Sequence, residues 1–133
     1  MDCLFCSIVA GDIPSMKVDE DELTIAIMDI NPAVPGHVLV MPKRHAANVL
    51  EVEPEDLSAV ALGVQRMARR VTEKLDAEGV SISNACGAVA GQTVFHLHFH
   101  VIPRHAGDPL RLPWTPTPTD MTAIAAVAAR LNA

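Results

Sequence analysis

Short runs rich in apolar and β-branched residues, separated by turn residues, occur in the first third of the chain, a pattern typical of strands. We predict strands at Met16–Val18, Leu23–Met28 and His37–Met41. The first two flank the acidic turn at residues 19–22, and Pro42 ends the third. Before them, the short apolar stretch Leu4–Ala10 predicts one or two helical turns, so the chain opens with a small helix and then a run of strands.

The pattern then changes to apolar residues spaced three and four apart, which predicts one long amphipathic helix. Pro54 suits the first helical position, and the acidic residues that follow it suit the positive end of the helix dipole. The apolar stripe consists of Leu57, Val60, Val64, Met67, Val71 and Leu75. Gly79 is the expected C-terminal stop, because glycine adopts the left-handed conformation that ends many helices.

Strands resume after this helix, at Val80–Ser83 and Val94–Ile102, and the second ends at Pro103. A proline-rich connection follows, and Thr119-Asp120 caps a last helix. Strands joined by short turns around one long helix predict an α+β fold, an antiparallel sheet of about five strands with a C-terminal helix. We expect residues 1–133 to form a single domain with its core in residues 3–108, followed by a proline-rich and helical segment at residues 109–133.

The amino-acid composition excludes several classes of function. The chain has 133 residues, of which 50% are hydrophobic and 20% charged, as in ordinary folded domains. Its net charge of −6 and its aromatic content of 3% argue against the basic surface and stacking platforms of nucleic-acid binders, and against an anionic membrane surface as partner. The N-terminus has no signal-peptide pattern, and no apolar run reaches the roughly 18 residues of a membrane span, so we expect a cytoplasmic protein.

The most informative segment is His96-Leu97-His98-Phe99-His100. Alternate side chains on a strand point the same way, so the three histidines are expected to share one face, about 7 Å apart. Such a row is costly to bury unless water, an anion or a metal meets it. The alternative is a surface histidine stripe that traps metal by accident.

The loop before this row also carries chemistry. Gly91 lets a ligand approach the backbone, and Gln92, Thr93 and Val94 can direct N–H groups and a hydroxyl at a phosphate. A structural β-turn is the other interpretation of these residues. If the first interpretation holds, an anion site lies next to a histidine nucleophile.

The segment Gly91–Val101 resembles the signature of the histidine triad (HIT) family, in which three histidines alternate with apolar residues. Further segments match the family's order and spacing, namely Phe5, Ile13-Pro14, Asp29–Pro32, Pro35–His37 and Met41–His45. The resemblance covers roughly residues 3–108. Within the family, the chain resembles the Hint-like bacterial-type branch, whose members begin with Cys-x-x-Cys.

The resemblance implies a nucleotidyl hydrolase or transferase that cleaves a nucleoside phosphoramidate or a dinucleoside polyphosphate at the α-phosphorus. His98 would attack phosphorus and form a covalent nucleotidyl-histidine, which suits a neutral imidazole with a reference pKa of about 6.5. His100 would contact the phosphate and handle leaving-group protons, and His37 would lie near the same site. The implied ligand is a purine nucleotide resembling AMP.

The same resemblance implies the nucleotide contacts. Asp29 would accept hydrogen bonds from the ribose hydroxyls, and Ile30, Phe5 and Ile13 would form an apolar slot for the base. For Asp29 the alternative is a residue that caps the Asp29–Pro32 turn. For the three apolar residues the alternative is a plain core role. Groups from Gly91 to Val94 would stabilise charge on the transferring phosphoryl group.

One position departs from the family pattern. Many members have Asn or Gln eleven residues before the first triad histidine, where this chain has Ala85, and Asn84 lies one residue earlier. On a strand, a shift of one residue reverses the side that a side chain faces. Asn84 is therefore expected to reach the phosphate only if a bulge restores its direction.

Cys3 and Cys6 can be interpreted in three ways from the residues alone: a redox dithiol, half of a zinc site, or two small buried side chains. The βαβ context usual for a redox pair is missing. In the branch that this chain resembles, such cysteines bind a structural zinc ion with two histidines, which here are His45 and His96. Four nitrogen and sulfur ligands make a closed tetrahedral site.

Two other functions remain open at this point. A metal-dependent hydrolase would use His96, His98 and His100 as ligands, although such sites usually include carboxylates and none lies within the motif. A nucleotide-binding sensor without turnover is the third possibility. Members of the family are commonly homodimers, and residues 55–78 could supply the contact surface or be plain core.

Overall fold

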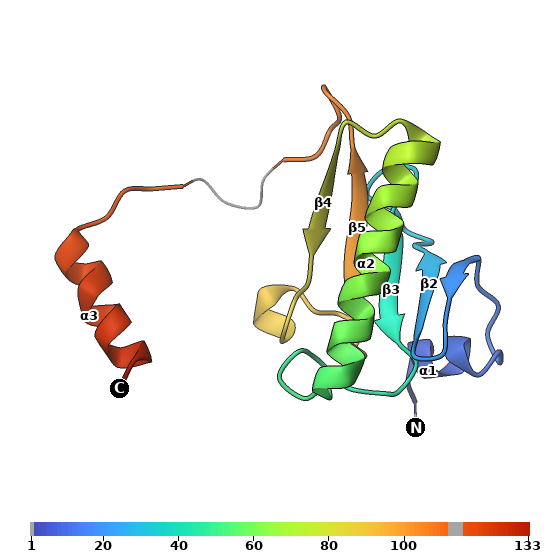
Figure 1. The fold of residues 1–133 in the computed structure, drawn as a ribbon, viewed down its shortest axis with the longest axis horizontal. Coiled ribbons are helices and arrows are strands. Elements are labelled where there is room, and N and C mark those ends of the chain that lie inside the picture. The colour runs from blue at the N-terminus through green and yellow to red at the C-terminus, as the bar shows by residue number, and fades with distance from the viewer. Residues whose placement is uncertain (1, 112–115) are drawn as a thin grey trace.

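The computed structural model describes residues 2–111 and 116–133. Its elements are α1 (Leu4–Val9), β1 (Lys17–Glu20), β2 (Thr24–Met28), β3 (Val38–Pro42), α2 (Pro54–Leu75), β4 (Gly79–Ser83), the 3₁₀ helix η1 (Ala88–Ala90), β5 (Phe99–Arg104) and α3 (Met121–Leu131). The five strands form one sheet in the order β1-β2-β3-β5-β4, and each neighbouring pair is antiparallel. The expected α+β fold is confirmed (Figure 1).

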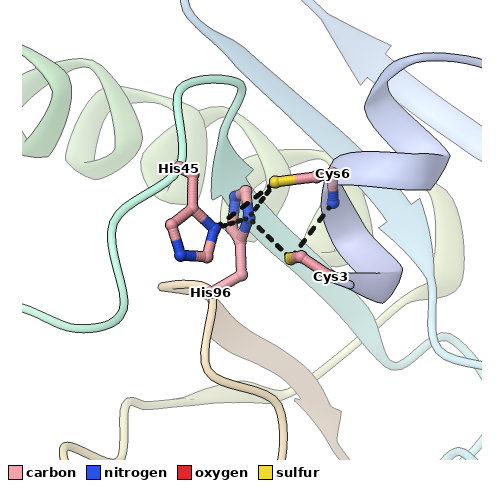
Figure 2. A group of neighbouring side chains, drawn as sticks. All are labelled: Cys3, Cys6, His45 and His96. Atoms are coloured by element: carbon pink, nitrogen blue, oxygen red, sulfur yellow. Dashed lines mark hydrogen bonds between the residues drawn. The ribbon is translucent and has the colours of Figure 1, made fainter. Parts of the chain in front are cut away.

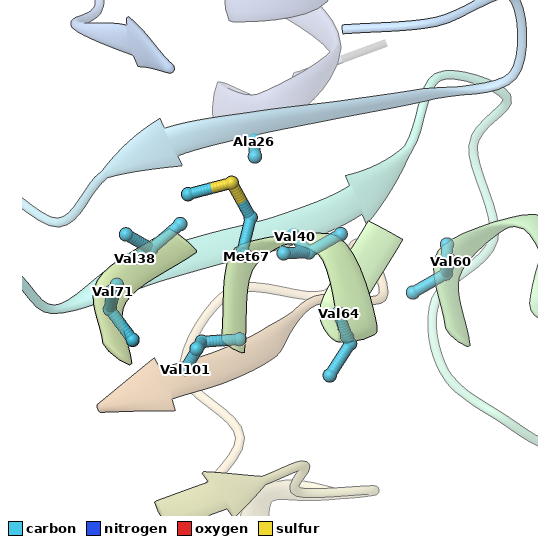
Figure 3. Close-up of a cluster of buried hydrophobic side chains, with 8 residues drawn as sticks. All are labelled: Ala26, Val38, Val40, Val60, Val64, Met67, Val71 and Val101. Carbon is cyan, nitrogen blue, oxygen red and sulfur yellow. The ribbon is translucent and has the colours of Figure 1, made fainter. Parts of the chain in front are cut away.

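Helix α2 covers one face of the sheet (Figure 1). Its buried stripe of Val60, Val64, Met67 and Val71 packs against sheet residues Ala26, Val38, Val40 and Val101 (Figure 3). These strand residues face α2 because every second side chain of a strand points to the same face of the sheet. The stripe predicted from the sequence is therefore the core of this layer, and its outermost members, Leu57 and Leu75, are not buried.

The strand residues that point away from α2 lie on the opposite face of the sheet. Ile25, Ile27, Leu39 and Met41 form a second buried cluster there with Cys3 and Phe5, the residues that begin α1. A short helix such as α1 is not stable on its own. Its packing on this face brings the N-terminal cysteines and Phe5 close to the residues that precede β5.

Several strand and helix ends differ from the expected ones: β1 includes Asp19 and Glu20 of the expected turn, β5 runs on to Arg104, and two further boundaries differ by more. Helix α2 ends at Asp76, which has a left-handed φ of 53°, whereas Gly79 already begins β4. Aspartate tolerates this conformation better than most residues do. Strand β5 begins at Phe99 and not at Val94, because the chain before it leaves the ladder: the Leu97 N–H donates to the carbonyl of Ala46 at 2.7 Å.

Helix α3 lies beyond the β4 edge of the sheet (Figure 1). Asp120 caps it, as expected, by accepting a hydrogen bond from the Thr122 N–H at 2.9 Å. Every residue of α3 is exposed. None of the helices in the described part of the chain combines the length and the apolar character that a bilayer crossing requires.

Candidate active site and metal centre

A pocket of about 320 Å³ lies on the sheet face that carries α1. Eight residues that the sequence predicted for the site line it together: Phe5, Ile13, Asp29, Ile30, Thr93, Val94, His98 and His100. They come from α1, the end of β2, the loop before β5 and β5 itself, so the fold joins segments that lie far apart in the sequence. Several other residues also line the pocket, among them Leu4, Ile8 and Asn31, which no motif in the sequence marked as site residues.

One wall of the pocket is apolar. Phe5 is buried and belongs to the core, and its ring meets the His98 ring edge-on at a centroid distance of 5.0 Å. Ile30 is 84% exposed and Ile13 38% exposed. Because a core residue would be covered, the exposure of these two isoleucines excludes the plain core role for them and leaves both side chains accessible from the pocket.

The hydrogen bonds of His98 fix its tautomer. Its Nδ1 lies 2.8 Å from the carbonyl oxygen of His96, and a carbonyl can only accept, so Nδ1 must carry the proton. In the neutral ring, Nε2 then has a free lone pair. His98 therefore offers an unprotonated nitrogen in the pocket that it lines.

A second chain of hydrogen bonds fixes the tautomers of His37 and His100. The Ala33 N–H donates to Nδ1 of His37 at 3.0 Å, so the neutral His37 ring carries its proton on Nε2. That proton is donated to Nδ1 of His100, 2.8 Å away, which leaves the proton of His100 on its own Nε2. Burial is the main cause that lowers the pKa of both imidazoles below 6.5, so both are neutral near pH 7.

The carboxylate of Asp29 has one oxygen in each of two roles. Oδ1 accepts a hydrogen bond from the Asn31 N–H at 2.8 Å, which is the turn-capping role given above as the alternative. Oδ2 lies 3.5 Å from Nε2 of His37. Because Asp29 also lines the pocket, its carboxylate can accept further hydrogen bonds from a bound ligand.

Three predicted phosphate contacts do not line this pocket. Asn84 donates from Nδ2 to the carbonyl of His98 at 2.8 Å, so it holds the backbone of the triad segment. Gly91 has a left-handed φ of 102°, which allows the sharp turn before the triad. Gln92 is buried, and its side-chain amide bonds to three surrounding backbone groups.

The first triad histidine lies apart from the other two. His96 is completely buried against the N-terminal cysteines, whereas His98 and His100 line the pocket. All three histidines lie on the α1 side of the sheet. The Phe5 ring meets the His96 ring at a centroid distance of 5.9 Å and the His98 ring at 5.0 Å, and His100 pairs with Leu39, which belongs to the same cluster as Phe5. Within residues 2–111 and 116–133, no group of convergent metal-ligating side chains contains all three histidines.

His96 instead completes a cluster with Cys3, Cys6 and His45 (Figure 2). Nδ1 of His96 lies 3.4 Å from Sγ of Cys3, 3.5 Å from Sγ of Cys6 and 3.3 Å from Nδ1 of His45. Sγ of Cys6 lies 3.4 Å from Nδ1 of His45. Ligands about 2.0–2.3 Å from a tetrahedral zinc ion are separated by about 3.5 Å, so these four atoms fit such an ion.

The surroundings of His96 support this fit. Its Nε2 donates to the carbonyl of Pro42 at 2.8 Å, which turns the free lone pair of Nδ1 toward the cysteines. Burial and the neighbouring Cys3 raise the pKa of the Cys6 thiol. A redox-active cysteine usually has a lowered pKa, so this environment argues against a redox dithiol.

Comparisons with known proteins agree with this geometry. Residues 10–107 match the HIT domain family. The adenosine 5'-monophosphoramidase hnt1 of Schizosaccharomyces pombe is 39% identical over 78% of this chain and 75% of its own length. The chain belongs to the histidine triad family.

Two solved structures are similar over nearly the whole chain. The crystal structure of SMU.412c from Streptococcus mutans is 41% identical and has a TM-score of 0.94 over 98% of this chain and 83% of that one. A Zn-bound histidine triad family protein from Mycobacterium smegmatis is 40% identical, with a TM-score of 0.80 over 99% of this chain and 96% of that one.

Proposed function

We propose that the protein hydrolyses or transfers nucleotidyl groups at the α-phosphorus of a purine nucleoside phosphoramidate or a dinucleoside polyphosphate. The observation that carries the proposal is the unprotonated Nε2 of His98 in a pocket with an apolar wall and a neighbouring proton donor, His100. The phosphoramidase name of the fission-yeast relative supports this substrate class.

The reaction takes two steps. In the first, Nε2 of His98 forms a bond to the α-phosphorus, the bond from phosphorus to the leaving group breaks, and the leaving group takes a proton that His100 relays from solvent. In the second, water attacks the nucleotidyl-histidine, the bond from phosphorus to Nε2 of His98 breaks, and the proton that the water loses returns to solvent through His100, so His98 is released unchanged. The two-step route replaces one difficult displacement with two easier ones.

The pocket residues hold the nucleotide in this proposal. The carboxylate of Asp29 accepts hydrogen bonds from the ribose hydroxyls, and Phe5, Ile13 and Ile30 contact the base. Thr93 and Val94 face the phosphate end, where backbone N–H groups stabilise the developing charge. Direct phosphate contacts by Asn84, Gly91 and Gln92 remain predictions, and the hydrogen bonds of Asn84 and Gln92 favour a positioning role.

We also propose that Cys3, Cys6, His45 and His96 bind a structural zinc ion. The ion would join α1 to the loop after β3 and to the triad segment, and it would leave His98 free of metal. We further propose that the protein forms a homodimer. A cytoplasmic location suits the two cysteine ligands, because a reducing compartment keeps thiols from forming disulfides.

The test compares His98→Asn with the matched control His105→Asn, because His105 is exposed and does not line the pocket. Turnover of adenosine 5'-phosphoramidate and of diadenosine polyphosphates is expected to fall by several orders of magnitude in His98→Asn only. Wild-type protein quenched in alkaline denaturant during turnover should carry a nucleotidyl group on the peptide that contains His98.

Removing the metal with a chelator distinguishes the proposed nucleophilic mechanism from a metal-dependent one. A chelator is expected to lower thermal stability and to leave turnover at saturating substrate unchanged while the protein stays folded. Immediate loss of turnover, restored by added metal with the fold intact, would replace the nucleophilic route with a metal-dependent one. Nucleotide binding without turnover in the zinc-loaded wild type would identify a sensor.

A further inference from the structure

Helix α3 has an apolar face that its own chain leaves open. Met121, Ile124, Val127 and Leu131 are 47–81% exposed, and Ala123 and Ala128 lie on the same side. Ala126 and Ala129 lie on the opposite side, as the period of the helix requires. An isolated helix of 11 residues is marginal in water, so α3 needs a surface to pack against.

The same placement occurs in a second protein. The superposition on the Streptococcus mutans structure covers 98% of this chain, so it includes α3, and its TM-score is 0.94. The two sequences are only 41% identical, yet a superposition this close over α3 requires a similar placement of the helix in both. A helix whose residues are all exposed keeps one position only if another molecule holds it, and the proposed homodimer supplies a second copy of the chain as that molecule.

The body of the molecule offers a surface of matching chemistry. A groove of about 530 Å³ lies between the C-terminal half of α2 and the first hairpin, and its floor is apolar: Val18, Met28, Val38, Met67, Val71 and Leu75. The groove lies near β1 and β2, at the other end of the sheet from α3 (Figure 1). The chain's own α3, where the structure places it, therefore does not fill it.

We propose that α3 of one copy packs into this groove of a second copy, and that the second copy returns the contact. The exchange covers two open apolar surfaces of each chain at once, and reciprocal exchange is what closed two-fold symmetry requires. This contact extends the proposed homodimer and does not depend on the chemistry proposed for His98.

The first test asks whether the contact is between copies. Isotope-labelled and unlabelled zinc-loaded chains are unfolded together and refolded, and isotope-filtered NOEs are measured from the labelled methyl groups of Ile124, Val127 and Leu131. NOEs to protons of the unlabelled chain, in the groove around Val71 and Leu75, are expected. NOEs only within the labelled chain, or none beyond α3, would overturn the proposal.

The second test measures affinity with a matched pair of variants. Val127→Glu places a charge on the apolar face of α3, and Ala129→Glu places the same charge on the opposite face. The dissociation constant of the dimer, from analytical ultracentrifugation, is expected to rise at least about tenfold in Val127→Glu and to stay within about twofold in Ala129→Glu.

Leu75→Glu tests the groove itself, because this side chain is 45% exposed at the rim of the groove. It is expected to match the effect of Val127→Glu, and the double variant should add little, since the two side chains meet across one contact. Equal weakening by Ala129→Glu, or an unchanged dimer in both Val127→Glu and Leu75→Glu, would refute the proposed contact. Turnover per active site should be retained in all variants, which distinguishes this failure from failure of the proposed reaction.

Discussion

Replacing Gln92 by Ala is expected to destabilise the protein far more than a surface substitution of the same kind. Gln92 is 5% exposed. Its Oε1 accepts from the Gly87 N–H at 2.8 Å, and its Nε2 donates to the carbonyls of Ala47 at 2.6 Å and Val94 at 3.1 Å. One amide thus ties the loop after His45 to the segment that leads into the triad.

The magnitude follows from the groups left behind. Each lost hydrogen bond costs about 1 kcal/mol net, and a buried group left without any partner costs about 1–3 kcal/mol. The three contacts together give a loss of about 3 kcal/mol in the free energy of unfolding. For a domain of this size, that corresponds to a fall of roughly 10 °C in Tm.

Urea unfolding of zinc-loaded protein, followed by circular dichroism, measures the loss. Gln65→Ala is the control, because Gln65 lies on an exposed position of α2 and its removal should change the free energy by less than about 0.5 kcal/mol. A loss below about 1 kcal/mol in Gln92→Ala would refute the reasoning. A normal stability with a raised KM would instead support the phosphate contact predicted from the sequence.

Three further predictions concern the metal, the histidine pair and the ribose contact. Chelation is expected to lower the Tm of the wild type and of the control Cys86→Ser, and to leave Cys6→Ser, which already lacks a ligand, unchanged in calorimetry. Burial holds the pKa values of His37 and His100 below 6.5, so the unfolded chain binds more protons than the folded chain once the pH falls below about 6.5. The free energy of unfolding, measured by urea titration, should therefore decrease as the pH falls from 7 to the pKa values of the folded protein. A variant with Gln in place of both His37 and His100 should show a smaller decrease. Asp29→Asn should raise KM with a smaller change in kcat, and a fall in kcat alone would contradict the ribose contact.

The order of elements could be predicted from the sequence because hydrophobic periodicity and turn residues are local signals. The apolar stripe of α2 correctly identified the side of this helix that packs on the sheet. The end of α2 and the start of β5 could not be predicted in this way. At Asp76 a left-handed conformation replaced the expected glycine stop, and at Leu97 a long-range hydrogen bond to Ala46 overrode a strong strand pattern.

The site shows the same division. The resemblance identified eight of the residues that line the pocket, because the family's motifs carry them in a fixed order. It could not show that Asn84 bonds to the carbonyl of His98, or that the Ala33 N–H sets the tautomer of His37. Both contacts use a backbone group as partner, and backbone groups leave no trace in residue identity.

Two sites share one motif because both lie on the α1 side of the sheet. The Phe5 ring meets the His96 ring at a centroid distance of 5.9 Å and the His98 ring at 5.0 Å. His96 contacts Cys3 of the metal cluster, and His98 lines the pocket on the other side of Phe5. The link between them is the His96 carbonyl, which takes the Nδ1 proton of His98. The segment that presents a ligand to the metal centre therefore also sets which nitrogen of the nucleophile is free.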